Sequence, residues 1–299
     1  MPAKILVSGS SGLVGAALLR ALVADGHQIT RLVHGVASGA GQVAWDPVRP
    51  LAPDAVSGFD AVVHLAGESI ASRWTPSKKK AIRDSRVLGT ANLADALARA
   101  PQPPRVFVSA SAIGYYGDRA DEVLREDSPS ARHGFLPDVC RDWEAVAQPA
   151  SSAGIRTVHL RTGIVLSAAG GALKQMLTPF RMGLGGKIAS GKQWMSWIDL
   201  DDEIGAIRHV LTNDSLRGPV NIVSPNPVTN AEFTRTLASA LSRPAIFPMP
   251  AFAARLLFGQ MGEELLLASQ RVEPTKLVSS GYVFQKPDLR LALMAILGK

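Results

Sequence analysis

The chain opens with K-I-L-V-S-G-S-S-G-L-V-G over residues 4–15. The apolar run Ile5–Val7 is typical of a buried parallel strand. Three glycines follow, and their spacing allows a tight turn, close approach of a pyrophosphate to the backbone, and close packing of the next helix on the strand. Free N–H groups at the start of that helix favour a bound phosphate. The stretch predicts a dinucleotide site formed by Gly9, Ser10, Ser11, Gly12, Leu13, Val14 and Gly15.

The residues that follow supply the expected context. Apolar residues at positions 14, 18, 21 and 22 lie on one face of a helix. Gly26 is placed to end that helix, and residues 28–33 read as a second strand. A glycine turn needed only for packing is the alternative, but a strand, turn, helix and strand in this order favour the dinucleotide site.

Strand and helix patterns alternate through the first half of the chain. Strands are predicted over residues 42–45, 61–65, 105–109 and 157–160, and helices over 78–99 and 138–147. This alternation predicts an α/β fold, a Rossmann-type doubly wound parallel sheet. We expect a dinucleotide-binding domain over residues 1–166, and a smaller, less regular substrate-side domain over 167–299 that sends segments back to the sheet.

Ligands of such sheets bind outside the carboxyl ends of the strands. The residues at these ends are therefore expected to face one crevice and to contact the cofactor. They are His34, Leu65, Ala66, Gly67, Ser109, Ala110, Arg161 and Gly163.

Composition limits the class of protein. Of the 299 residues, 46% are hydrophobic and 19% charged, and no apolar run approaches the roughly 18 residues that span a bilayer. A single cysteine, Cys140, suits a reducing compartment, and we expect a cytoplasmic protein without a membrane partner. The net charge of +7 comes from scattered basic residues, which favours a solvated surface over nucleic-acid binding. The six histidines show no metal-ligand spacing, so no metal site is predicted.

The motifs together resemble the extended short-chain dehydrogenase/reductase group, and within it the atypical "epimerase family protein" branch. The runs that carry the resemblance are H-L-A-G-E (64–68), S-A-S-A-I-G-Y-Y-G (109–117), G-F-L (134–136), W-E (143–144), R-T-G-I-V-L (161–166), S-W-I (196–198) and Q-R-V (270–272). Members of that branch bind a nicotinamide dinucleotide, usually taken to be NADP, and their substrate is not established.

The resemblance implies an active site with Ser, Tyr and Lys, in which the Lys lies four residues after the Tyr. With Glu144 as the marker that follows the pair, the Tyr position is Leu136 and the Lys position is Cys140. A register shifted by one residue gives Phe135 and Val139. Neither register supplies a proton donor or a cation, so the usual mechanism cannot run through these positions.

The remaining catalytic candidates are Ser111, Tyr115 and Tyr116. Ser111 matches the Ser that holds the substrate oxygen. Either tyrosine is a candidate proton donor, and the alternative is that both form the wall of the pocket with satisfied hydroxyls. Cys140 is either a nucleophile, which needs an electropositive and partly exposed setting, or a buried thiol.

The end of the second strand bears on cofactor choice. An acidic residue there selects NAD by binding the ribose 2′-hydroxyl, but this strand ends in His34. We therefore expect NADP, with NAD as the alternative. The resemblance makes Asp46 a candidate for the adenine amino group, and the alternative is a solvated loop residue.

The second half supplies Gln193, Trp194 and Trp197 as substrate-binding candidates for a small molecule that the sequence does not identify. Two hypotheses follow. One is an NADP-dependent oxidoreductase or nucleotide-sugar epimerase that lacks the usual Tyr and Lys. The other is a non-catalytic dinucleotide-binding sensor or regulatory protein. In either case we expect a monomer or a homodimer.

Overall fold

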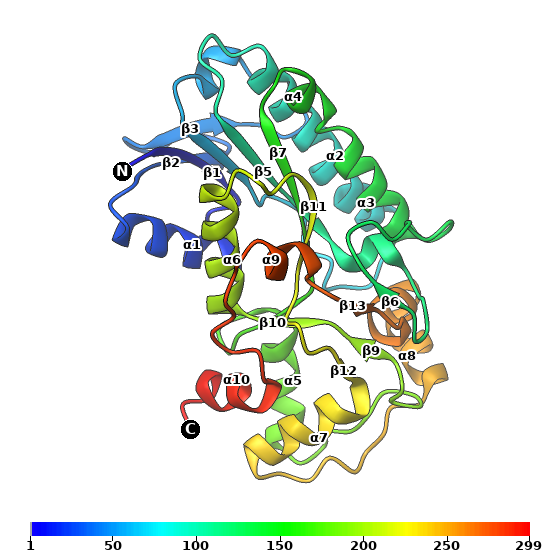
Figure 1. Cartoon of the computed structure of the whole chain (residues 1–299). Coiled ribbons are helices and arrows are strands. Elements are labelled where there is room, and N and C mark those ends of the chain that lie inside the picture. Colours follow the sequence, from blue (N-terminus) through cyan, green and yellow to red (C-terminus); the bar gives the residue numbers. More distant parts are fainter. Residues whose placement is uncertain (1) are drawn as a thin grey trace.

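A seven-stranded sheet forms the centre of the computed structural model, which describes residues 2–299 (Figure 1). Every pair of neighbouring strands in it is parallel. The order is β11-β7-β5-β4-β1-β2-β3. The strands are β1 Lys4–Ser8, β2 Gln28–His34, β3 Gln42–Trp45, β4 Ala61–His64, β5 Val106–Ala112, β7 Arg156–Thr162 and β11 Gly218–Ile222. The predicted Rossmann-type α/β fold is confirmed.

Helices cover both faces of the sheet. On one face lie α1 (Leu13–Ala24) and α6 (Leu200–Thr212), whose apolar residues join strand residues such as Val7 and Val108 in one core. On the other face lie α2 (Pro76–Ala98), α3 (Phe135–Ala145) and α4 (Gln148–Ser152), and the core there includes Leu93 of α2. The central strands are buried on both faces, which explains their continuous apolar runs.

The chain reverses direction across the sheet between β1 and β4. From β1 it proceeds to β2 and β3 on one side, whereas β4, β5, β7 and β11 extend on the other. Ligands of open α/β sheets bind at such a switch point, outside the carboxyl ends of the strands. The glycine turn after β1 therefore lies where a ligand crevice is expected.

The C-terminal half builds a second core below the sheet as drawn in Figure 1. Its helices are α5 (Gly171–Arg181), α7 (Asn230–Leu241) and α10 (Leu289–Ile296), which pack around the buried Trp197 and Phe233. Short pairs of strands support it: β8 (Ile164–Leu166) with β10 (Trp197–Asp199), and β9 (Trp194–Met195) with β12 (Val228–Thr229). This half also returns β11 to the edge of the main sheet, beside β7.

The last segments bring residues from the C-terminal end back to the first half. Strand β13 (Arg271–Val272) pairs with β6 (Val123–Leu124). Before it come α8 (Ala251–Phe258) and a short π-helical turn, η3 (Gly262–Leu267), and after it comes α9 (Thr275–Ser279). The remaining turns are the 3-10 segments η1 (Pro53–Val56) and η2 (Ile113–Tyr116).

Helix starts differ from the prediction in two places. Helix α2 begins at Pro76, because Thr75 accepts a hydrogen bond from the Lys78 N–H and proline fits the first turn of a helix. Helix α3 begins at Phe135 and includes Pro137, which needs no N–H partner so close to the helix start.

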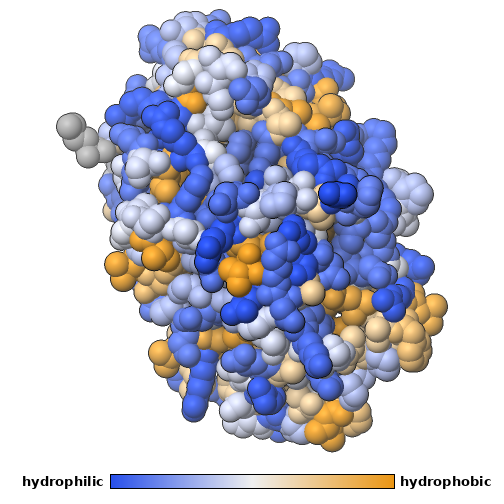
Figure 2. Space-filling model, turned by 45° about the vertical axis from the view of Figure 1, so that its right-hand side comes forward, coloured by the Kyte–Doolittle hydropathy of each residue, from blue (hydrophilic) through white to orange (hydrophobic). Residues whose placement is uncertain are grey.

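The surface is mostly hydrophilic on the face that Figure 2 shows, with separate apolar patches between the polar side chains. Among the described residues, no helix combines the length and the apolar character that crossing a bilayer requires.

Candidate functional site

The turn between β1 and α1 requires glycine at positions 9 and 15. Gly9 has φ +68°, and a Cβ there would lie 2.5 Å from the carbonyl carbon of Leu65, just after β4. A Cβ on Gly15 would overlap the carbonyl oxygen of Gly9. The distance at Gly9 and the overlap at Gly15 are both closer than a normal contact, so the turn packs closely on the residue after β4 and α1 packs closely on the turn.

The start of α1 is open to an anion. Gly12 is its N-cap residue and provides no side-chain cap, and the first turn contains no acidic residue. The first N–H groups of the helix are thus left to a ligand, and the helix dipole favours negative charge there. The close backbone approach of Gly9 and Gly15, together with this uncapped helix, fits a bound pyrophosphate. We call residues 9–15 the glycine cradle.

A buried polar chain fixes the strand ends beside this cradle. The Ser8 hydroxyl lies 2.6 Å from Nδ1 of His64, and Nε2 of His64 lies 3.1 Å from the Thr90 hydroxyl. Trp143 donates from Nε1 to that hydroxyl at 2.8 Å. Burial lowers the pKa of His64 to about 3, so its ring is neutral. The chain ties β1, β4, α2 and α3 together, and no local sequence pattern indicates it because its members lie far apart in the sequence.

A cavity of about 710 Å³ opens next to the cradle. Leu13, the first residue of α1, lines it, as do Ser111 at the end of β5 and Gly163 after β7. Its other walls come from α3, α5, α8 and η3, and most of them are apolar. The ionisable residues among the described lining are Arg73, Arg86, Cys140 and Glu264.

A buried network leads from this cavity into the interior. Ser111 donates to Oε1 of Glu144 at 2.7 Å, and Arg161 donates to both Glu144 oxygens at 2.9 Å. Arg161 also donates to the Tyr116 hydroxyl at 3.0 Å, and that hydroxyl donates to Asn221 Oδ1 at 2.7 Å. Burial alone lowers the pKa of Arg161, but its bonds to Glu144 raise it overall, so the guanidinium stays charged.

This network opposes the catalytic role predicted for Tyr116. Its ring is fully buried, and its hydroxyl is engaged with Arg161 and Asn221. Burial raises its pKa to about 12, against the partial offset of Arg161. Tyr115 stacks under the Arg161 guanidinium, with 3.5 Å between Cζ and the ring centre. Neither tyrosine lines the described cavity, so the alternative of structural wall residues fits the geometry.

Two predicted cofactor residues are likewise occupied elsewhere. The Arg161 side chain is 3% exposed and held by Glu144, so it does not present its charge to a ligand. Ser109 is fully buried and its hydroxyl donates to the carbonyl of Ala110. Ser111, in contrast, lines the cavity as expected.

The three substrate-side candidates separate in the structure. Trp194 lines the cavity, and its substrate role stays a prediction. Gln193 does not, because its amide donates to the carbonyls of Ile188 and Leu266 and fixes that turn. Trp197 is a fully buried core residue whose Nε1 donates to the Asn226 carbonyl. The substrate roles predicted for Gln193 and Trp197 are therefore not supported by their positions.

The two residues assigned to the adenosine side lie at the ends of β2 and β3. His34 ends β2 on the surface, beside Trp45 of β3. Asp46 accepts from the Val48 N–H at 3.1 Å and lies 3.3 Å from Arg49, so it shapes its own turn. A cofactor contact for either residue remains a prediction.

The comparisons with known proteins agree with this arrangement. The model of the NAD dependent epimerase/dehydratase family matches residues 5–223, and a domain of unknown function matches 249–296. The chain is 42% identical over 293 residues to epimerase family protein Mb2239 of Mycobacterium bovis, covering 97% of this chain and 96% of that protein. The chain belongs to the NAD dependent epimerase/dehydratase family.

Two solved structures resemble this family member along its whole length. One is human epimerase family protein SDR39U1 (isoform 2) with NADPH, at 36% identity and a TM-score of 0.91, with 99% of both chains covered. The other is a nucleoside-diphosphate sugar epimerase from Corynebacterium glutamicum, at 39% identity and a TM-score of 0.84, covering all of this chain and 59% of that one. The predicted resemblance to the epimerase family branch is confirmed.

In this family member the cavity face of α3 is apolar. Leu136 and Cys140, four residues apart, both line the cavity, and a Cβ on Gly114 would lie 3.2 Å from the Leu136 side chain and 3.8 Å from the Cys140 sulfur. Val139 also lines it, whereas Phe135 packs against Trp74. In the register marked by Glu144, both the Tyr position (Leu136) and the Lys position (Cys140) line the cavity. In the shifted register, only Val139 does.

Cys140 behaves as a buried thiol. It is 2% exposed, and burial, with the charge of Glu144, raises its pKa to about 12. Only the thiolate is nucleophilic, so we expect its labelling by a disulfide reagent at pH 7.5 to be at least about a hundredfold slower than that of free cysteine. Labelling of native protein and of protein in urea measures this. Rapid labelling of the native protein would contradict the assignment.

One buried carboxyl was not foreseen. Glu203 of α6 is 1% exposed, accepts a hydrogen bond from Thr162 at 3.0 Å, and has no partner for Oε2 within the described chain. Burial raises its pKa from 4.5 to about 8. Between about pH 4.5 and pH 8, Glu203 is therefore protonated in the native protein and ionised in the unfolded chain.

This proton gives a prediction of pH-dependent stability. As pH rises from about 4.5 to 8, the Glu203 contribution to the free energy of unfolding should fall, with a slope of up to about 1.4 kcal/mol per pH unit. Glu203→Gln cannot titrate and should remove this part of the slope. Urea unfolding of both proteins from pH 6.5 to 8 measures it, because below 6.5 the buried neutral His64 acts in the opposite direction. Equal slopes in the two proteins would contradict a buried neutral carboxyl.

Proposed function

We propose that this protein binds NADP(H) in the glycine cradle and transfers a hydride between the cofactor and a small molecule in the adjoining cavity. The observation that carries this proposal is the contact between the two sites. Leu13 is both the first residue of the helix at the cradle and part of the cavity wall, and Gly163 and Ser111 line the cavity at the ends of neighbouring strands. A dinucleotide with its pyrophosphate at the cradle is long enough to place one end there.

NADP is favoured over NAD by two observations. The second strand ends in His34, without an acidic side chain to bind a ribose 2′-hydroxyl. The human relative, 36% identical, was crystallised with NADPH. Titration with NADPH and with NADH compares the two cofactors. We expect one NADPH per chain and at least about tenfold weaker binding of NADH, since a 2′-phosphate adds charge-assisted bonds. Equal affinities would overturn the preference.

The chain's own residues limit the chemistry at the cavity. The cofactor, when bound, supplies or accepts the hydride. The Ser111 hydroxyl donates its hydrogen bond to Glu144. Its oxygen lone pairs are therefore left to accept a hydrogen bond from a ligand in the cavity. The described lining contains no Tyr, Lys, His or Asp. We therefore assign Ser111 to substrate orientation, and the proton that a carbonyl oxygen needs after it receives the hydride comes from solvent water.

Oxidation of NADPH, followed at 340 nm with a panel of carbonyl compounds, quinones and nucleotide sugars, tests hydride transfer. Once an acceptor is found, Tyr116→Phe should leave kcat within about twofold while lowering stability by about 1–3 kcal/mol, because the lost hydroxyl serves buried partners. A kcat lowered a hundredfold or more with unchanged NADPH affinity would make Tyr116 a catalytic residue and contradict our account.

The second candidate is a dinucleotide-binding sensor or regulatory protein without turnover. It is favoured by the same lack of Tyr, Lys, His and Asp among the described cavity residues. Stoichiometric NADPH binding without oxidation by any member of the panel would support this second function over the first.

A further inference from the structure

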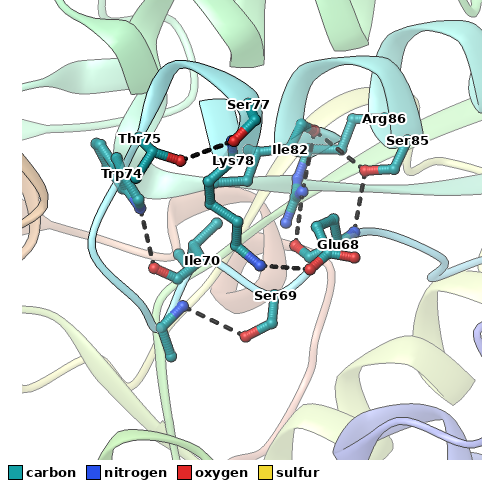
Figure 3. Close-up of polar contacts among 11 residues, drawn as sticks. Glu68, Ser69, Ile70, Trp74, Thr75, Ser77, Lys78, Ile82, Ser85 and Arg86 are labelled. Carbon is teal, nitrogen blue, oxygen red and sulfur yellow. Dashed lines mark hydrogen bonds and ion pairs between the residues drawn. The ribbon is translucent and has the colours of Figure 1, made fainter. Parts of the chain in front are cut away.

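The Arg86 guanidinium is one of several groups of α2 that hold the loop between β4 and α2. Arg86 of α2 donates from Nη1 to the carbonyls of Glu68, at 2.9 Å, and Ile82, at 3.2 Å (Figure 3). Its Nε and Nη2 have no hydrogen-bond partner in the part of the chain that the structure describes. The Glu68 carboxylate is not its counter-ion, since it pairs with Lys78 instead (Figure 3).

This guanidinium lies at the wall of the cavity. Its Cζ stands 5.1 Å from the ring centre of Trp143, and a Cβ on Gly67 would lie 3.2 Å from it. Arg86 also lines the cavity beside Cys140. No carboxylate of residues 2–299 lies within 4.0 Å of it, and burial lowers its pKa, partly offset by Cys140 and Glu68. A partly buried cation without an ionic partner therefore faces an apolar space.

The other charges of the cavity do not neutralise Arg86. The carboxylate of Glu264 accepts hydrogen bonds from the N–H groups of Phe135, at 3.0 Å, and Leu136, at 2.7 Å, and so caps the start of α3. Arg73 is exposed and adds positive charge at the wall. The net charge offered to a ligand is positive, whereas most of the lining is apolar.

We propose that Arg86 binds the anionic group of an apolar substrate, so that the cavity takes a carboxylate-bearing aromatic or aliphatic compound. This inference rests on the proposed function for the cofactor end of the site. The free Nε and Nη2 present the geometry that carboxylates bind. The many hydroxyls of a sugar would lose their water against walls such as Leu136 and Met261 without gaining partners, which makes a nucleotide sugar the poorer fit.

A pair of competitors of nearly equal shape tests the proposal. The fluorescent reporter N-phenyl-1-naphthylamine is displaced from the NADP⁺-saturated protein by 1-naphthaleneacetate, an anion, or by 1-naphthaleneacetamide, which is neutral. Saturation with NADP⁺ keeps anions out of the cradle. We expect the acid to bind wild-type protein about tenfold to a hundredfold more tightly than the amide, the usual gain from a hydrogen bond to a charged group.

Three variants assign that preference to one side chain. In Arg86→Gln the ratio of the two affinities should fall to about one. Arg86→Lys keeps the positive charge and should retain most of the preference for the acid over the amide. This variant still tests the charge if Arg86→Gln does not fold. Arg83→Gln is the matched control, because Arg83 lies three residues earlier on the same helix but pairs with Asp142 at the surface; it should bind like wild type.

The outcomes are distinct. A ratio near one in wild-type protein, a ratio that persists in Arg86→Gln, or an equal loss in Arg86→Lys and Arg86→Gln overturns the proposal. So does a tenfold loss of NADP⁺ affinity in Arg86→Gln with the ratio unchanged, which would make Arg86 a cofactor ligand. If wild-type protein does not bind NADP⁺, the proposed function is overturned instead. The ratio of acid to amide affinity is then measured without cofactor, so that the role of Arg86 is still tested.

Discussion

Replacement of Gly15 with alanine is expected to weaken NADPH binding by about a hundredfold or more. The added methyl group would overlap the carbonyl oxygen of Gly9 and also approach the Cα of Ser10. Both are backbone atoms of the cradle itself, so α1 must move away from the turn. A shift of this kind costs about 1–3 kcal/mol in a packed site, and the helix N–H groups lose their alignment with the pyrophosphate as well. Titration calorimetry with NADPH measures the loss.

The control for Gly15→Ala lies at the other end of the same helix. Gly26 has φ +82° and open space around its Cα, and asparagine tolerates this conformation better than other residues. Gly26→Asn should therefore bind NADPH like wild type. Unchanged affinity in Gly15→Ala would show that the pyrophosphate does not lie at the cradle, and equal losses in both variants would point to a general effect on α1.

Removal of the Arg161 charge should cause the largest loss of stability. Arg161→Met leaves the Glu144 carboxylate, which is 13% exposed, beside Ser111 without its cation. Breaking one side of a buried ion pair costs about 3–5 kcal/mol, since the remaining charge is left desolvated and unpaired. The melting temperature of a chain of this size should then fall by on the order of 10 °C.

A double variant separates the charge from the packing. Arg161→Met with Glu144→Leu removes both charges and should recover a large part of the lost stability, because an apolar pair of similar volume often replaces a buried ion pair at little cost. Urea unfolding of the four proteins gives the coupling energy. If the losses of unfolding free energy are additive, so that the double variant is less stable than either single variant, Arg161 and Glu144 do not stabilise the protein as an ion pair.

The start of the fold was predictable because its signals are local. The apolar run of β1, the glycine turn and the face of α1 all lie within twenty residues, and each needs only its neighbours to be recognised. The alternation of strands and helices then predicts a parallel sheet, but it does not give the order of the strands or the return of β11 to the edge of the sheet. Ser111 was expected at the crevice because it follows the strand predicted over residues 105–109, and Trp194 was expected near the ligand from the family resemblance; both line the cavity.

The predicted site residues that do not line the cavity are those whose partners are distant in the chain. Tyr116 was a plausible acid until Asn221 and Arg161 were seen to hold its hydroxyl. Trp197 was a plausible ligand anchor until β10 placed it in the second core. Glu203 and Arg86 carry no local signal, because their chemistry comes from burial and from residues contributed by other elements.

A crystal structure of the protein with NADPH tests the central claim most directly. Our account predicts the pyrophosphate against the N–H groups that follow Gly12, and the nicotinamide in the cavity lined by Ser111 and Cys140. It also predicts that the Tyr116 hydroxyl still donates to Asn221 when the cofactor is bound. A cofactor bound away from the glycine cradle, or a nicotinamide outside this cavity, would contradict the account.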